Sequence, residues 1–142
     1  MAQQDPIVII EDDMDDQEFV KEILKEMDVK HEIIFFGDAI DALAFLKTTS
    51  KQPFLIICDI NLPKMNGFEF KIELDNDAEL RKKSIPFIFF STDAAKPVVT
   101  EAFTKLTVQG FFKKSYTFED LKQNLKIILD YWKLCKHPHR DS

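Results

Sequence analysis

Three short apolar runs without polar alternation constrain the fold of this chain more than any other feature. They are P-I-V-I-I (Pro6 to Ile10), F-L-I-I-C (Phe54 to Cys58) and P-F-I-F-F (Pro86 to Phe90). A strand with one solvated face alternates apolar and polar residues, so uninterrupted runs of this kind indicate strands buried on both faces of a parallel sheet. Two weaker strand candidates are Glu32 to Phe36 and Val108 to Phe112.

Segments with helical periodicity fill the gaps between these strands. Apolar stripes at helical spacing run from Phe19 to Met27, from Val98 to Leu106 and from Leu121 to Trp132, and shorter helices are expected at Ile40–Leu46 and Met65–Asp75. The order is therefore a strand followed by a helix, repeated five times. Such alternation with short connections implies right-handed crossovers and predicts a doubly wound α/β fold around a five-stranded parallel sheet.

Length and composition limit the remaining possibilities. The 142 residues suit a single domain spanning 1–142, with a core at about 5–133 and a frayed tail at 134–142. We interpret the polar run Asp75–Ser84 as a solvated helix end and loop. Nothing after the last predicted helix resembles an output domain, so we expect a stand-alone module.

Charge and cysteine usage indicate the environment of the protein. The net charge of -6 argues against binding to a nucleic-acid backbone, which needs a basic face. No apolar run approaches the roughly 18 residues of a membrane span, and the N-terminus lacks the features of a signal peptide. Cys58 and Cys135 match no metal or redox spacing and are interpreted as free thiols. We therefore expect a cytoplasmic protein without nucleic-acid or membrane partners.

Polar residues collect where the predicted strands end. Glu11 and Asp12 follow the first strand, Asp59 the third, Ser91-Thr92 the fourth and Lys113-Lys114 the fifth. Because the carboxyl ends of parallel strands share one edge, where ligands bind in such folds, these groups are expected to form one site. Crowded carboxylates repel one another, and Mg²⁺ would relieve that repulsion through oxygen ligands. A carboxylate beside a metal, a lysine and a hydroxyl indicates phosphoryl transfer to an aspartate.

With these residues in place, the sequence resembles a response-regulator receiver domain of two-component signalling over about Asp5 to Lys133. The motifs that carry the likeness are the acidic pair Glu11-Asp12, the loop D-I-N-L-P-K-M-N-G with Asp59, Pro63 and Gly67 in register, Ser91 five residues after Pro86, and Lys114. The resemblance implies the (βα)5 flavodoxin-like, CheY-like fold of a bacterial receiver.

The resemblance also implies a role for each site residue. Asp59 would accept a phosphoryl group from a kinase phosphohistidine, and Lys114 would pair with the phosphate. The Mg²⁺ ligands would be Glu11, Asp12, Asp59 and the backbone carbonyl of Asn61, while Pro63 and Gly67 would shape the loop. Ser91 would hydrogen-bond a phosphoryl oxygen, and Phe111 would follow Ser91 as a switch aromatic.

The partners that the resemblance implies are proteins. They are a sensor histidine kinase or histidine phosphotransfer protein, a downstream effector, and a second copy bound through the predicted helix near 98–106, the strand near 108–112 and the helix near 121–132. The chain would not act as an enzyme beyond its own Mg²⁺-dependent phosphorylation and slow dephosphorylation.

Several departures and alternatives accompany this interpretation. The family usually has Lys-Pro where this chain has Lys114-Ser115, and a cis bond before Ser would cost about 2.5–4 kcal/mol, so a trans bond is expected. Lys113 rivals Lys114, and Thr92 rivals Ser91 as the switch hydroxyl. The acids Asp13, Asp15 and Asp16 are interpreted as an acidic helix start that suits the helix dipole.

Other classes of function fit less well. A phosphatase of the haloacid-dehalogenase type needs a second Asp where Asn61 stands, and a nucleotide-binding protein conflicts with only 3 Gly and no G-x-G-x-x-G motif. A degenerate receiver that binds proteins without phosphorylation remains the alternative.

Overall fold

Five parallel strands form one sheet with the order β2-β1-β3-β4-β5 in the computed structural model of the chain, which describes residues 4–139. The strands are β1 (Gln4–Ile10), β2 (His31–Phe36), β3 (Leu55–Cys58), β4 (Phe87–Ser91) and β5 (Gly110–Lys113). The chain passes from β1 to β2 on one side and then crosses to β3 on the other. The topological switch point, where such folds bind ligands, therefore lies between β1 and β3.

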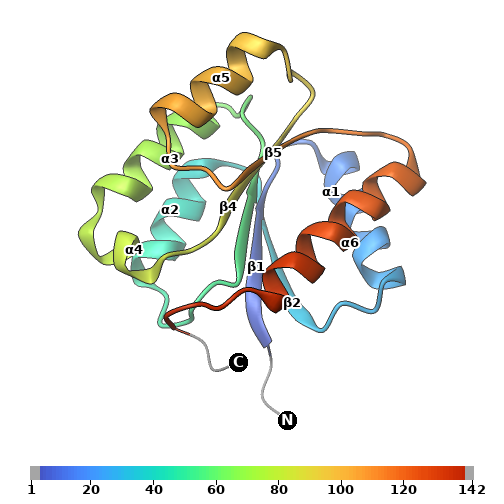
Figure 1. Cartoon of the computed structure of the whole chain (residues 1–142), viewed down its shortest axis with the longest axis horizontal. Helices are drawn as coiled ribbons and strands as arrows, with labels where there is room; N and C mark the ends of the chain where they lie inside the picture. Colours follow the sequence, from blue (N-terminus) through green and yellow to red (C-terminus); the bar gives the residue numbers. More distant parts are fainter. Residues whose placement is uncertain (1–3, 140–142) are drawn as a thin grey trace.

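Helices cover both faces of this sheet. They are α1 (Met14–Glu26), α2 (Ala39–Thr48), α3 (Gly67–Asn76), α4 (Ala78–Lys83), α5 (Lys96–Lys105) and α6 (Phe118–Leu134). Figure 1 shows α1 and α6 on one face and the other four helices on the opposite face. The doubly wound flavodoxin-like fold predicted from the sequence is confirmed.

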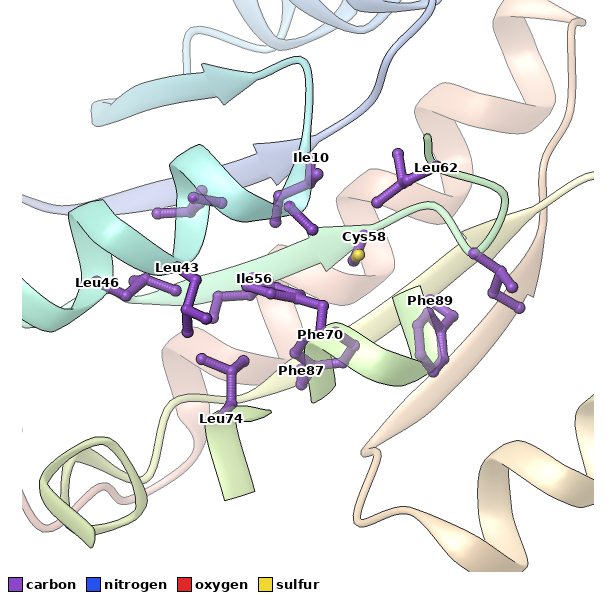
Figure 2. Close-up of a cluster of buried hydrophobic side chains, with 14 of the residues drawn as sticks. Ile10, Leu43, Leu46, Ile56, Cys58, Leu62, Phe70, Leu74, Phe87 and Phe89 are labelled. Atoms are coloured by element: carbon purple, nitrogen blue, oxygen red, sulfur yellow. The ribbon is translucent and has the colours of Figure 1, made fainter. Parts of the chain in front are cut away.

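Alternate side chains of the central strands enter two separate apolar cores. In β3, Ile56 and Cys58 join the core beneath α2, α3 and α5, whereas Leu55 and Ile57 join the core beneath α1 and α6. Figure 2 shows part of the first core, where Ile56 lies near Phe70 and Phe87. Both faces of a central strand are apolar for this reason, which explains the runs without alternation.

The polar run Asp75–Ser84, expected to be a solvated helix end and loop, does contain the end of α3, but the expected loop is the additional helix α4, so that part of the prediction was wrong. The Asp77 carboxylate caps this helix by accepting the Leu80 N–H at 3.0 Å, and Ser84 ends it in the left-handed region with a φ of 54°. Leu80 is only 5% exposed and packs into the core. A single buried leucine leaves no periodicity in the sequence, which is why the pattern did not predict a helix.

A frayed tail was predicted from residue 134, but Leu134 is the last residue of α6, and residues 135–139 reach the end of α4. The Nε2 atoms of His137 and His139 lie 2.7 Å from the Ser84 carbonyl and 2.6 Å from the Lys82 carbonyl. A carbonyl oxygen can only accept, so each histidine donates from Nε2. Residues 140–142 of the predicted tail lie outside the described part of the chain.

Candidate functional site

Two buried carboxylates stand side by side at the switch point. Glu11 follows β1 directly and Asp59 follows β3 directly, and these neighbouring strands run in register, with Ile10 opposite Cys58. The Asp59 N–H donates to the Ile10 carbonyl at 3.1 Å, which extends the pairing of the strands to the carboxylate itself. The backbone of the sheet therefore sets the position of both acids.

Asp12 completes a group of three carboxylates that could hold a metal ion. Glu11, Asp12 and Asp59 each offer one oxygen, and these oxygens lie within 4.8 Å of one another. Glu11 and Asp59 are buried while Asp12 is exposed, so the group opens toward solvent on one side. Hard divalent cations such as Mg²⁺ prefer such oxygen ligands and keep part of their water shell.

Lys114 brings a positive charge to the same place. It follows β5, and its backbone N–H donates to the Ser91 carbonyl at 2.8 Å. Its Nζ lies 3.0 Å from Asp59 Oδ2 and also contacts Glu11 Oε1. The Lys114–Ser115 peptide bond is trans, as expected, since residues 4–139 contain no cis bond. The rival Lys113 is exposed, and no ion pair joins it to these acids within that range.

A third carboxylate, that of Asp16, also contacts Lys114. Asp16 Oδ2 lies 3.2 Å from Lys114 Nζ, although Asp16 had been interpreted only as part of an acidic helix start. Asp13 fits that interpretation, because its side chain caps α1 by accepting the N–H groups of Asp15 and Asp16. For Asp16 the interpretation was incomplete, and sequence spacing offers no signal for a contact across 98 positions.

Burial governs the protonation of this cluster. Removal from water raises the pKa of Glu11 from 4.5 to about 7, and this effect outweighs the opposing hydrogen bond and charge of Lys114. Burial alone would lower the pKa of Lys114, but the hydrogen bonds and charges of Glu11 and Asp59 prevail and raise it above its usual value. Lys114 therefore stays charged at neutral pH, while the Glu11 carboxyl changes between its protonated and ionised forms near pH 7.

The loop after Asp59 approaches the strand so closely that only glycine fits at its end. A Cβ on Gly67 would lie 2.5 Å from the Asp59 carbonyl oxygen and 2.9 Å from Ile60 Cα. The Gly67 N–H donates to the Ile60 carbonyl at 2.8 Å, and this hydrogen bond joins the two ends of the loop that contains Pro63. Asn61 lies on the exposed rim and donates its N–H to Asp59 Oδ1 at 3.3 Å. The role of its carbonyl as a metal ligand stays a prediction.

The predicted switch residues lie at the ends of β4 and β5. Ser91 is fully buried at the end of β4, where its Oγ accepts the Asp93 N–H at 3.2 Å, whereas Thr92 is exposed. Phe111 is half-buried in β5, with its ring centroid 5.9 Å from that of Phe89. Ser91 and Phe111 thus lie on neighbouring strands, and the carbonyl of Ser91 is joined to Lys114 as described above.

The match to known proteins agrees with this geometry. The sequence profile of the response regulator receiver domain matches residues 7–126. Response regulator Rcp1 of Synechocystis sp. (strain ATCC 27184 / PCC 6803 / Kazusa) is 31% identical over 131 residues, which cover 89% of this chain and 87% of Rcp1.

Two solved structures are similar over almost the whole chain. The phosphorylated cyanobacterial phytochrome response regulator RcpA superposes with a TM-score of 0.83 at 28% identity, covering 95% of this chain and 99% of RcpA. The Mn²⁺-bound form of Rcp1 superposes with a TM-score of 0.81 at 30% identity, again covering 95% and 99%.

The chain belongs to the response regulator receiver domain family. Members of this family act in two-component signalling, together with kinases and effector proteins. Within residues 4–139, no helix combines the length and the apolar character needed to cross a bilayer.

Proposed function

We propose that this domain accepts a phosphoryl group on Asp59 from the phosphohistidine of a kinase or phosphotransfer protein. The observation that carries the proposal is the position of the Asp59 carboxylate, which lies at the switch point within a group of three acids and 3.0 Å from Lys114 Nζ. The phosphorylated state of RcpA supports it. The domain thereby acts as a phosphoacceptor and not as an enzyme with a separate substrate.

The transfer is a displacement at phosphorus. An Asp59 carboxylate oxygen attacks, the new O–P bond forms as the P–N bond to the histidine breaks, and the bonding electron pair stays with the imidazole nitrogen, which takes up a proton. Asp59 thus becomes an acyl phosphate. Lys114 already donates to Asp59 Oδ2, so its ammonium is placed to stabilise negative charge as it develops on the transferred group.

The carboxylates at the site fit a divalent cation, and we assign its ligands to Glu11, Asp12, Asp59 and the carbonyl of Asn61. The Mn²⁺-bound form of Rcp1 supports this assignment, with Mg²⁺ as the expected ion for this chain. When bound, Mg²⁺ would neutralise charge on the phosphoryl oxygens. The protein supplies the fixed ligands: Glu11 and Asp59 are buried at strand ends, so they need little reorganisation.

Phosphorylation would act on the face formed by α5, β5 and α6. The added charge of roughly -1.5 to -2 would draw the Ser91 hydroxyl toward a phosphoryl oxygen, and Phe111 would move into the space beside it. Thr92 would remain at the exposed rim. This face presents exposed apolar residues for an effector or a second copy of the chain, namely Phe103 on α5 and Ile127, Tyr131 and Leu134 on α6.

The test is phosphate-affinity gel analysis after incubation with acetyl phosphate. Wild type should be labelled in the presence of Mg²⁺ and not after chelation, and Asp59→Asn should not be labelled. A matched control is Asp28→Asn, the same substitution in an exposed turn with a φ of 55°, where Asn is tolerated. Full labelling of Asp59→Asn would refute the assignment. Absence of labelling in a wild type that still binds Mg²⁺ would favour the degenerate, phosphorylation-independent binding module.

A further inference from the structure

The first turns of α1 and α3 use the acid at the third helical position in different ways. In α3, Glu69 reaches back to the N–H of the cap residue Asn66 at 3.0 Å and completes a capping box. In α1 the equivalent acid is Asp16, but the N–H of its cap residue Asp13 donates instead to Glu11 Oε2 at 3.2 Å. Asp16 is therefore released from local capping, and its carboxylate turns to Lys114.

The Lys114 ammonium has three protons, and three carboxylates surround it. The side chains of this cluster are mostly shielded from solvent, with exposures of 10% for Lys114, 8% for Glu11, 11% for Asp59 and 17% for Asp16. Glu11 and Asp59 also belong to the candidate metal group, whereas Asp16 does not. A cation bound to Glu11 and Asp59 would compete with Lys114 for their oxygens and leave the Asp16 contact intact.

We propose that Asp16 is a positioning residue that holds the Lys114 ammonium at the mouth of the site when Mg²⁺ occupies the other carboxylates. Asp16 touches neither the phosphoryl group nor the cation and acts through Lys114. The Lys114 backbone N–H donates to the Ser91 carbonyl, so the ion pair between Asp16 and Lys114 also connects the start of α1 with the ends of β4 and β5. The inference deepens the proposed phosphoacceptor function and depends on it for its effect on rate.

Asp16→Asn removes the charge while keeping the size of the side chain. An ammonium–carboxylate hydrogen bond is roughly twice as strong as a neutral one, so the maximal rate of labelling by acetyl phosphate in saturating Mg²⁺ should fall about tenfold. The acetyl phosphate concentration at half-maximal rate should change less than about twofold, because Asp16 does not contact the donor. Asp16→Glu restores the carboxylate and should recover most of the rate.

A second readout needs no phosphodonor. In protein with ¹⁵N-labelled lysine and saturating Mg²⁺, the Lys114 ammonium resonance, assigned by its loss in Lys114→Met, should be protected from rapid exchange in wild type and lost in Asp16→Asn. Asp15→Asn is the matched control, because Asp15 is exposed in the same helical turn and is not among the three carboxylates that form ion pairs with Lys114. It should retain both the resonance and the rate.

The two readouts separate the possible failures. If Asp16→Asn matches Asp15→Asn in both rate and ammonium protection, the inference is wrong although the phosphoacceptor function stands. If wild type is not labelled at all, the proposed function fails, and the ammonium resonance alone decides whether Asp16 holds Lys114. Loss of thermal stability with the resonance and rate retained would show a merely structural role and would also overturn the inference.

Discussion

The charge balance around Lys114 predicts that Lys114→Met destabilises the metal-free protein and that Mg²⁺ reverses most of the loss. Methionine keeps most of the length and apolar character of the lysine stem but removes the only cation that contacts Glu11, Asp16 and Asp59 among the described residues. The buried Glu11 and Asp59 and the partly buried Asp16 would then lie close together without a counterion, and their mutual repulsion would be uncompensated.

The size of the effect follows from this burial. Removing one partner from a buried ion pair costs about 3–5 kcal/mol. Glu11 already has a pKa of about 7 and can take up a proton at neutral pH, so we expect the lower end, about 3 kcal/mol. An acid with a raised folded-state pKa contributes stability that is present at low pH and lost as pH rises. The deficit should therefore be smaller at pH 5 than at pH 8.

Urea denaturation at pH 7, once with chelator and once with saturating Mg²⁺, measures the loss of stability in the metal-free protein and its reversal by the ion. In Mg²⁺ the deficit should shrink to under about 1 kcal/mol, because the ion replaces the missing positive charge and, by linkage, stabilises the variant more than wild type. Lys113→Met is the matched control and should change little in either condition, since Lys113 is exposed. An equal deficit with and without Mg²⁺ would show that Lys114 contributes packing and not charge, and would refute the reasoning.

Three further predictions concern the loop, the metal group and the core. Gly67→Ala should lower the free energy of unfolding by about 1–3 kcal/mol and slow labelling, because the new Cβ would lie 2.5 Å from the Asp59 carbonyl oxygen. Urea denaturation measures the loss of stability and the gel assay measures the labelling. An unchanged labelling rate would contradict the prediction. Mg²⁺ affinity, measured by calorimetry, should fall about tenfold from pH 8 to pH 6, because Glu11 with a pKa of about 7 must lose its proton to bind the ion. That pH dependence should disappear in Glu11→Gln, and its persistence would assign the proton elsewhere. Phe70→Ala should lower the free energy of unfolding by about 3–5 kcal/mol, since Phe70 is fully buried against Phe87. The control Ile72→Ala, in the same helix, should cost far less because Ile72 is exposed. Similar costs in thermal denaturation would contradict the packing seen in Figure 2.

The sequence alone determined the fold class and the main members of the site. Runs such as Phe54 to Cys58 lack alternation because both faces of the strand are buried. The pattern lies within a few consecutive residues, so it can be read from the sequence. Once the strands are parallel, their carboxyl ends must share one edge, so Glu11, Asp59 and Lys114 could be placed together without knowing a single distance. The apolar runs also placed the bounds of all five strands to within two residues, whereas α1 begins five residues and α6 three residues before the predicted apolar stripes.

The tertiary structure alone decided what depends on contacts between distant segments. Helix α4 forms in a polar run because Leu80 packs into the core and Asp77 caps the helix. His137 and His139 lie against that helix because they meet carbonyls at its end. Asp16 resembles an ordinary acid of a helix start until β5 brings Lys114 beside it. Periodicity records which side of an element is buried, whereas the partner of a charged side chain is set by the packing of elements far apart in the chain.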